Sequence, residues 1–482
     1  MAKTQTPLTF PEPPKELTGG RFMELLKFFG PGAIMASVTI GTGEVLFASR
    51  GGAVFGYTML WAFVLGAIMK GFQTYSANRY IVLTGEHPFA RWADLFPGPR
   101  GWFPVLMGVL SVACFPAWGA GVPGTLATLF AQIFGIMSSQ AWATILILLA
   151  WGMFLAGGYD AMEKVQIAII AAMVLAVLVA VVAAKPDWLA ALEGSFIPQI
   201  PHYAPWIAEK YPSIASRPVW VEVVTYLGAI GGGTYDYIGY TGLMREKGWG
   251  ILGRSDIREI EEKLVALKTG EQVPLSTDPD EVRKGLAWAK APMMDNIVCY
   301  GLLVLFTIGF MVNGANILHT QQQIPAGNDL LTHQVQFLTL IHPVLKYLYY
   351  LAVTFALFGT AYGCHQGYVY TFRETFAPVS KTIREYPVSK MRIWTSAYTA
   401  IGGLLLTWTG WNPVAIVTPA SIVGGVLTGG IWCLAMYYTD RKMLPKPYQM
   451  KPWVGIAVII SGIAMTAMGV ISVLQYFKVI PG

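Results

Sequence analysis

Charged residues are scarce in this chain of 482 residues. Aspartate, glutamate, lysine and arginine together make up 12% of the sequence, whereas hydrophobic residues make up 54%. A soluble domain carries about 25% charged residues, because its surface must be solvated. The composition therefore excludes an ordinary soluble protein. It indicates a polytopic membrane protein whose main partner is the lipid bilayer.

Cysteine and histidine are also scarce. The four cysteines lie in or beside apolar segments and none has a CxxC partner, so neither a disulfide framework nor a zinc site is indicated. His365 is the one histidine deep within an apolar segment, and no second histidine stands at ligand spacing. The clustered His, Cys or acidic motifs of a membrane enzyme are therefore missing. We expect no enzymatic activity and no cofactor.

Apolar runs of about 20 residues recur along the chain, as membrane-spanning helices require. No short cleavable signal precedes the first of them. The pattern predicts an all-α polytopic membrane protein with about eleven spans. The expected division is a cytoplasmic tail at 1–22, spans one to five at 23–184, an extracellular loop at 185–216, spans six to ten at 217–438 with a cytoplasmic loop at 245–290, and an eleventh span at 452–476.

Basic residues gather in alternate loops between these spans. They lie before the first span and between the second and third, the eighth and ninth, and the tenth and eleventh. Because basic residues favour the cytoplasmic side, the pattern predicts a cytoplasmic N-terminus and an extracytoplasmic C-terminus in a cell membrane. The net charge of +6 is therefore explained by topology, and it does not indicate a nucleic-acid partner.

Glycine-rich sequences interrupt the first and the sixth span. Residues 41–44 and 231–234 are poor helix formers, and broken helices at membrane depth persist only where they are buried or line a cavity. Five spans followed by five more, each set beginning with an interruption, predict an inverted repeat with a central transport site. The candidate substrate-binding residues are Gly41, Thr42, Gly43, Glu44, Gly232, Gly233, Thr234 and Asp236.

Four ionisable residues lie within these apolar segments. Glu44 is the strongest candidate for substrate binding, because intramembrane acids are usually functional; the alternative is a neutral, hydrogen-bonded carboxyl. Asp236 could bind substrate or cap the restarted helix. Lys70 and Arg50 need partners, and Glu44 and Asp236 are the acids available. Structural ion pairs are favoured, with two functional alternatives: Lys70 replaces a coupling cation, or Arg50 receives a substrate carboxylate.

Five blocks of the sequence resemble the Nramp (natural resistance-associated macrophage protein) metal transporters. The resemblance implies their LeuT-like fold, an inverted repeat of five plus five helices with helices 1 and 6 unwound at mid-membrane, and secondary-active transport by alternating access. An eleventh helix would follow the repeat. The blocks are Gly30–Ala33, Gly51–Trp61, Gly121–Thr125, Gly158–Glu163 and Pro186–Pro198.

The chain departs from that family at the positions which imply metal and proton transport. The family has Asp-Pro-Gly-Asn in its first broken helix, where this chain has residues 41–44, and Met-Pro-His in its sixth, where this chain has residues 232–234. Trp118 and Gly121 stand where the family has acids on a proton route. Glu44 is then the single candidate metal ligand at these positions. We expect a rebuilt site that is not selective for transition metals, and proton coupling is doubtful.

The substrate is left open by these residues. Carboxylates and hydroxyls suit a hard cation such as Mg²⁺ or a polar organic solute. Glycines in place of larger residues predict added space, which favours an organic solute. The alternatives are a divalent cation transporter of the Mg²⁺ or Mn²⁺ type, and a non-transporting sensor. The readout of such a sensor would lie in the 245–290 loop, where the apolar spacing from Ile257 to Leu267 predicts an amphipathic helix.

Overall fold

The computed structural model is helical through almost all of its regular structure. Within the described residues, the only β contact is an isolated bridge between Leu8 and Leu275. The description covers residues 7–19, 21–157, 159–267, 270–327 and 329–481. The side chains of Ser37, Thr42, 159–167 and 169–170 lie outside it.

Helices occupy the stretches 23–184, 217–438 and 452–476, in which the sequence predicts the spans. Six described helices are long and apolar enough to cross a membrane as single units, or seven if one bent pair counts as a span. The first and sixth segments consist of short pieces because each is broken. In chain order the segments are α3 (Pro31–Thr39), η2 (Thr42–Ala48) and α4 (Ser49–Phe55); α5 (Leu60–Thr84); α7 (Trp102–Val112) and α8 (Phe115–Phe134); α9 (Ser139–Ala156); α10 (Tyr159–Ala183); α14 (Val219–Ala229) and α15 (Thr234–Leu243); α18 (Lys290–Asn313) and η5 (Gly314–His319); α20 (Leu345–Phe376); α22 (Val388–Thr407); α23 (Pro413–Ala420), η7 (Ser421–Leu427) and α24 (Thr428–Met443); and α25 (Pro452–Tyr476).

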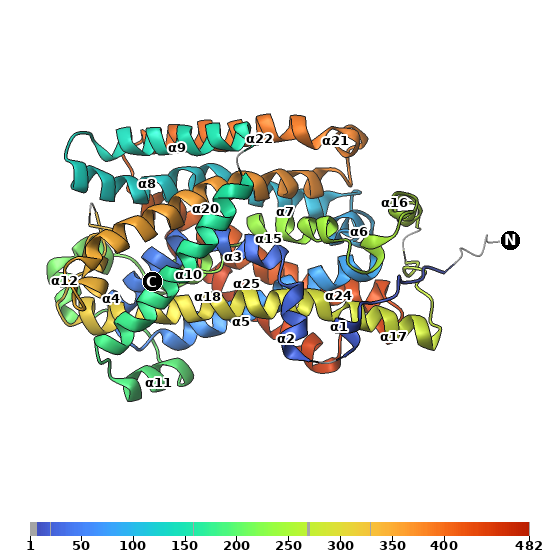
Figure 1. Cartoon of the computed structure of the whole chain (residues 1–482), viewed down its shortest axis with the longest axis horizontal. Coiled ribbons are helices and arrows are strands. Elements are labelled where there is room, and N and C mark those ends of the chain that lie inside the picture. Colours follow the sequence, from blue (N-terminus) through green and yellow to red (C-terminus); the bar gives the residue numbers. More distant parts are fainter. Residues whose placement is uncertain (1–6, 20, 158, 268–269, 328, 482) are drawn as a thin grey trace.

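The bundle has two sides, with the broken segments between them. On one side α8, α9, α20 and α22 pack on one another, and on the other side α5 packs on α18, α24 and α25, and α24 packs on α25 (Figure 1). The pieces of the first and sixth segments lie between the sides: α3 packs on both α18 and α20, and α15 packs on α20. Both breaks are therefore enclosed by protein, as backbone groups without lipid-compatible partners require.

The connecting segments add short helices at the two ends of the bundle. The loop after α10 carries α11 (Trp188–Phe196), α12 (Pro205–Lys210) and α13 (Pro212–Ala215). The other long loop carries α16 (Ile257–Val265) and α17 (Pro279–Trp288), and α16 buries Ile260 and Leu264. The predicted amphipathic helix is thus confirmed. Because Leu267 follows the end of α16, the helix is shorter than the apolar spacing suggests.

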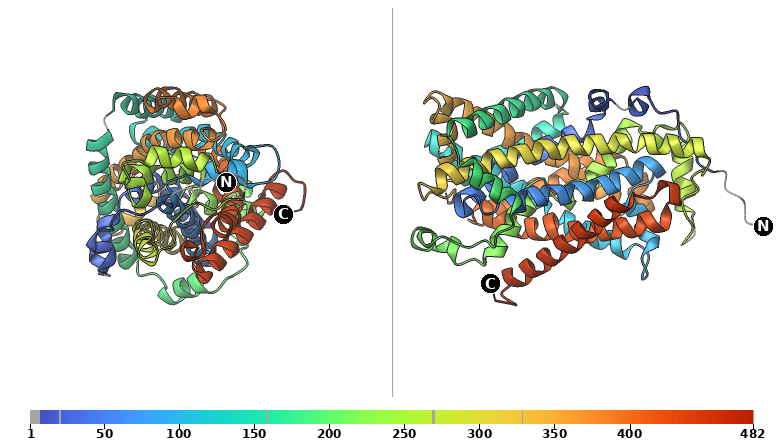
Figure 2. Two further views of the ribbon diagram at one scale, coloured as in Figure 1. Left: turned by 90° about the vertical axis from the view of Figure 1, so that its right-hand side faces the viewer. Right: turned by 90° about the horizontal axis from the view of Figure 1, so that it is seen from below.

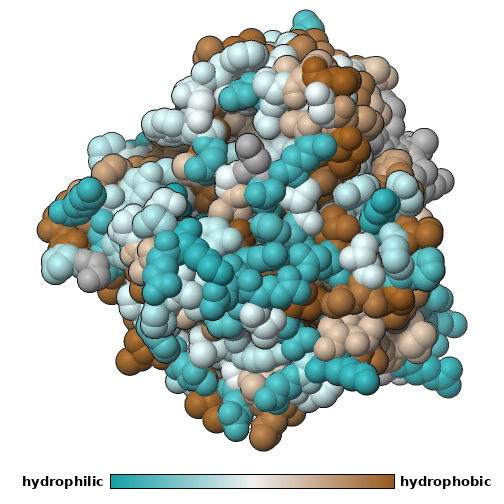
Figure 3. Space-filling view, turned by 90° about the vertical axis from the view of Figure 1, so that its left-hand side faces the viewer, coloured by the Kyte–Doolittle hydropathy of each residue, from teal (hydrophilic) through white to brown (hydrophobic). Residues whose placement is uncertain are grey.

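The described chain begins at the end of the bundle that carries α17 and finishes at the opposite end (Figure 1, Figure 2). The end that carries α12 has hydrophilic side chains gathered across its middle, with hydrophobic side chains around much of the rim (Figure 3). Opposite placement of the termini agrees with an odd number of crossings. The side of the membrane on which each terminus lies stays a prediction.

The two breaks lie at the predicted interruptions, although their bounds differ. The first consists of Ile40 and Gly41, and the wide-turn helix η2 begins at Thr42, so Gly43 and Glu44 are helical. The second comprises residues 230–233, since α15 begins at Thr234. The first break is thus shorter than the glycine-rich sequence 41–44, whereas the second has the same length as 231–234 and begins one residue earlier.

Candidate substrate site

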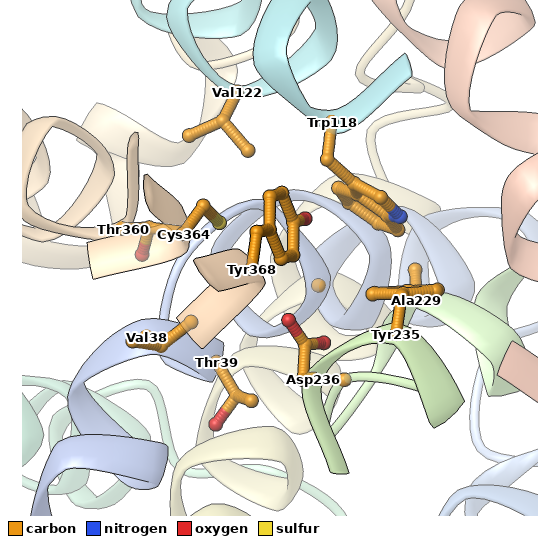
Figure 4. A pocket seen from close by; sticks show the side chains of 12 residues that line it. Val38, Thr39, Trp118, Val122, Ala229, Tyr235, Asp236, Thr360, Cys364 and Tyr368 are labelled. Carbon is orange, nitrogen blue, oxygen red and sulfur yellow. The ribbon is translucent and has the colours of Figure 1, made fainter. Parts of the chain in front are cut away.

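A small cavity lies between the two breaks, about 20 Å³ in volume, which is room for about one water molecule. Its walls come from the first segment, α8, the sixth segment and α20 (Figure 4). The buried, central position between two broken helices is where a transporter of this design binds its substrate. The lining residues are Val38, Thr39, Gly43, Trp118, Val122, Ala229, Gly232, Tyr235, Asp236, Thr360, Cys364 and Tyr368.

Asp236 is the acidic residue of the cavity. Its Oδ2 accepts a hydrogen bond from the Gly233 N–H at 3.0 Å, which caps the first turn of α15. The carboxylate also points into the cavity, toward Tyr368 (Figure 4). The two roles that the sequence left open for Asp236, capping and substrate contact, are therefore compatible. One carboxylate oxygen holds the helix start while the group as a whole faces the cavity.

Aromatic rings form much of the remaining wall. The Trp118 and Tyr235 ring centroids are 5.7 Å apart, and those of Tyr235 and Tyr368 are 6.5 Å apart with nearly perpendicular planes. Tyr368 is fixed from behind by Phe115, whose ring stacks on it at 3.9 Å. Ring faces attract cations through their quadrupole, most strongly where water is excluded. A carboxylate among three rings is chemistry that suits a cation.

Glu44 does not line this cavity. Its side chain is fully buried, and Oε1 accepts a hydrogen bond at 2.7 Å from the N–H of Gly231 in the second break. The carboxylate therefore joins the first segment to the sixth. Thr234 also points elsewhere, since its hydroxyl accepts a hydrogen bond from Thr428 at 2.9 Å. Of the two acids, Asp236 lines the cavity and Glu44 does not, and a substrate contact by either acid stays a prediction.

The glycines at the breaks do not create space. A Cβ on Gly41 would lie 2.3 Å from the Thr360 hydroxyl oxygen, and one on Gly43 would lie 2.3 Å from the carbonyl oxygen of Ala229. Gly232 has a φ of +80°, a conformation that favours glycine. The prediction of added volume at these positions was wrong, because neighbouring helices close in on the missing side chains.

Lys70 on α5 is fully enclosed and points at the second break. Its Nζ lies 2.7, 3.2, 2.5 and 2.7 Å from the carbonyl oxygens of Leu227, Gly228, Ile230 and Gly232, so these four acceptors share its three N–H donors. No salt bridge joins it to Glu44 or Asp236, whose side chains are both described. The expected ion pair was wrong: the sequence offered only side-chain acids as partners, whereas a broken helix also offers backbone carbonyls.

Arg50 has a partner that the sequence analysis missed. Its guanidinium contacts Glu222 at 2.7 Å, Tyr226 at 2.9 Å and the Pro325 carbonyl at 2.7 Å. Glu222 also pairs with Arg217 at 3.2 Å. Glu222 belongs to α14, so the bridge joins α4, the last piece of the first segment, to the start of the sixth. The expected pairing of Arg50 with Glu44 or Asp236 was wrong, and Arg50 is not free for a substrate.

The remaining expected residues are placed as follows. Thr39 and Gly232 line the cavity, and Gly233 lies in the second break. The side chain of Thr42 lies outside the described residues, as do Gly158 and the side chains of 159–163. Only the backbone of 159–163 is described in that block.

The sequence analysis missed the contribution of α20, which supplies Thr360, Cys364 and Tyr368. Threonine, cysteine and tyrosine at spacings of four in an apolar run are a signal that could have identified this face of the helix. In the described part of the chain, no group of three or more His, Cys, Asp or Glu side chains is arranged to hold a metal ion.

The comparisons with known proteins agree with this arrangement. A family model described as natural resistance-associated macrophage protein-like matches residues 32–232. A manganese transporter from Eremococcus coleocola superposes over all of this chain and 93% of its own, with a TM-score of 0.62 at 14% identity. The chain is a relative of the Nramp family. It has the LeuT-like, all-α fold that the sequence predicts, and MhsT, solved with L-phenylalanine, shares that fold at a TM-score of 0.53 and 14% identity, over 92% of this chain and 98% of its own.

The curated relatives match the chain over a limited region. The divalent metal cation transporter MntH of Caldanaerobacter subterraneus subsp. tengcongensis is 23% identical over 184 residues, which cover 38% of this chain and 43% of MntH. The metal transporter nramp1 homolog of Dictyostelium discoideum is 26% identical over 182 residues, 37% of this chain and 33% of the relative. The matched region is thus less than half the length of each curated Nramp relative.

Proposed function

We propose that this Nramp relative is a secondary-active transporter of a small cation, which it moves across a cell membrane by alternating access. The LeuT-like fold and the buried cavity between two broken helices support a transport role. The bridge between Arg50 and Glu222 would close the outer side of the cavity, and the packing of α3 on α15 and α18 would close the inner side. The N-terminus would be cytoplasmic and the C-terminus extracytoplasmic, as the basic loops favour.

The observation that carries the substrate proposal is the wall of the cavity, where one carboxylate stands among three aromatic rings. Asp236 provides the charge, and Trp118, Tyr235 and Tyr368 provide the ring faces. Such a wall suits a small ammonium-type cation, because ring faces bind an alkylated ammonium without requiring lone pairs. A transition metal would instead need several oxygen, nitrogen or sulfur ligands around it.

A divalent metal cation is the second candidate, favoured by the names of the relatives. The MntH protein and the Eremococcus coleocola transporter are named for divalent metal and manganese. In this chain, Asp236 would have to be supplemented by the Thr39 and Thr360 hydroxyls, the Cys364 thiol and backbone carbonyls. The oxygen ligands of such a site would favour hard cations such as Mg²⁺ over transition metals. The sulfur of Cys364 is the one ligand that suits a softer metal.

Uptake into proteoliposomes tests the proposal. We expect saturable uptake of methylammonium by the wild type, loss of that uptake in Asp236→Asn, and no saturable uptake of Mn²⁺ or Cd²⁺. Asp280→Asn is the matched control, since Asp280 lies on the exposed loop helix α17 and makes surface ion pairs. Saturable Mn²⁺ uptake that is lost in Asp236→Asn would favour the metal candidate. If calorimetry shows tight binding of methylammonium but the proteoliposomes take up none, the result would instead indicate the sensor alternative.

A further inference from the structure

At the second break, four backbone carbonyls surround the ammonium group of Lys70, which stabilises them. Leu227 and Gly228 belong to the last turn of α14, and Ile230 and Gly232 belong to the break itself. Their carbonyl oxygens lie 2.5–3.2 Å from Lys70 Nζ. Carbonyl oxygens without helical partners, at the negative end of a helix dipole, form a site for a cation.

The other polar groups of the break have partners of their own. The Gly231 N–H donates to Glu44, and the Gly231 carbonyl accepts from the Tyr237 hydroxyl at 2.6 Å. The Gly233 N–H donates to Asp236. The four carbonyls therefore depend on Lys70, since no described hydroxyl, amide or other cation donates to them except Tyr237, which makes a longer 3.3 Å contact with Gly232.

We infer that Lys70 is a tethered cation that occupies a carbonyl site built for a free monovalent ion. The side chain reaches the break from α5, a continuous helix, so the positive charge is covalently held at the transport site and cannot dissociate. The four carbonyls are therefore neutralised by Lys70 and do not need to bind Na⁺, K⁺ or ammonium from solution. This assignment concerns the break of the sixth segment and does not depend on the substrate proposed above.

The assignment has a consequence for coupling. A protein that binds a free ion at such a site changes its stability with the concentration of that ion. A protein with a built-in ammonium does not, so removing alkali ions from the medium leaves the wild type unchanged. Deletion of the side chain turns the same carbonyls into an empty cation site, and a small ammonium ion then fills it.

Chemical rescue of Lys70→Ala tests the inference on purified protein in detergent, with no substrate present. The substitution removes the equivalent of n-propylammonium, and we expect a lower apparent melting temperature that recovers in a saturable way on addition of n-propylammonium or ammonium chloride. Matched tetramethylammonium chloride, which cannot donate hydrogen bonds, should not restore it. The wild type gives the reference response to each salt through the Asp236 cavity, and Lys70→Ala should exceed that reference only with ammonium and n-propylammonium.

Two further variants keep the test decisive. Lys70→Met fills the space of the lysine stem without donors, so it should be destabilised and respond to ammonium no more than the wild type does. Lys290→Ala removes a lysine that donates to one carbonyl, that of Leu17 at 2.9 Å, and should show no ion dependence. The inference is overturned if Lys70→Ala melts like the wild type, or if ammonium stabilises Lys70→Met, the wild type and Lys70→Ala equally. It is also overturned if Lys70→Ala cannot be purified even in ammonium whereas Lys70→Met can. If the transporter fails to take up methylammonium in proteoliposomes, that result would overturn the proposed function and leave the assignment of Lys70 unaffected.

Discussion

Separation of Arg50 from Glu222 should cost several kilocalories per mole, because the pair is almost fully withdrawn from solvent. The side chains are 4% and 0% exposed, and the closest contact between them is 2.7 Å. Removal of one partner from a buried pair typically costs about 3–5 kcal/mol, since the other charge is left without compensation. We expect Glu222→Leu to reach that range, because Arg50 keeps only Tyr226 and the Pro325 carbonyl.

The double variant should be less destabilised than the sum of the two single variants. Arg50→Met combined with Glu222→Leu leaves no buried charge, although it strands the Pro325 carbonyl and the Tyr226 hydroxyl, each at about 1–3 kcal/mol. A double-mutant cycle on the free energy of unfolding, measured by chemical denaturation in mild detergent, should give a coupling of about 2–3 kcal/mol. The control is Arg100 with Asp94, whose side chains are 60% and 27% exposed; such a pair couples by less than about 1 kcal/mol. Equal coupling in the two cycles would refute the reasoning.

Three other substitutions follow from the geometry of the breaks. Gly232→Ala should destabilise by about 1–3 kcal/mol and weaken substrate binding, because φ is +80° and a Cβ would lie 2.7 Å from Asp236 Oδ2. The control is Gly301→Ala, within α18 and with open space around it. It should not lower the melting temperature or change binding, since alanine favours a helix interior over glycine. Asp295→Asn should loosen the start of the first segment, since its carboxylate accepts from two glycine N–H groups and a tyrosine hydroxyl; faster hydrogen exchange confined to that segment would be the signature, and unchanged exchange would contradict it. Glu44→Gln should keep binding and fold, because an amide oxygen can still accept from the break, so loss of binding with an intact fold would return Glu44 to the substrate site.

The sequence by itself determined the class of this protein and the position of its centre. Low charge and long apolar runs require a membrane, and glycines within two of those runs weaken helix formation wherever they occur. These are local properties, so the ranges of the helices, the two interruptions and the amphipathic helix of the long loop could all be predicted. The Nramp likeness added the fold, because the motifs that carry it are also local in the chain.

Only the tertiary structure decided what each side chain at the centre does. Lys70 lies more than 150 positions from the carbonyls that it contacts, Arg50 lies 172 positions from Glu222, and Tyr368 reaches the cavity from a helix with no interruption. Sequence reasoning paired charges with charges, whereas a broken helix offers carbonyl and N–H groups that compete for the same side chains. Glu44 and Asp236 look alike in sequence. The packing of α20 and α8 beside the second break places one of them at the cavity and the other against the backbone.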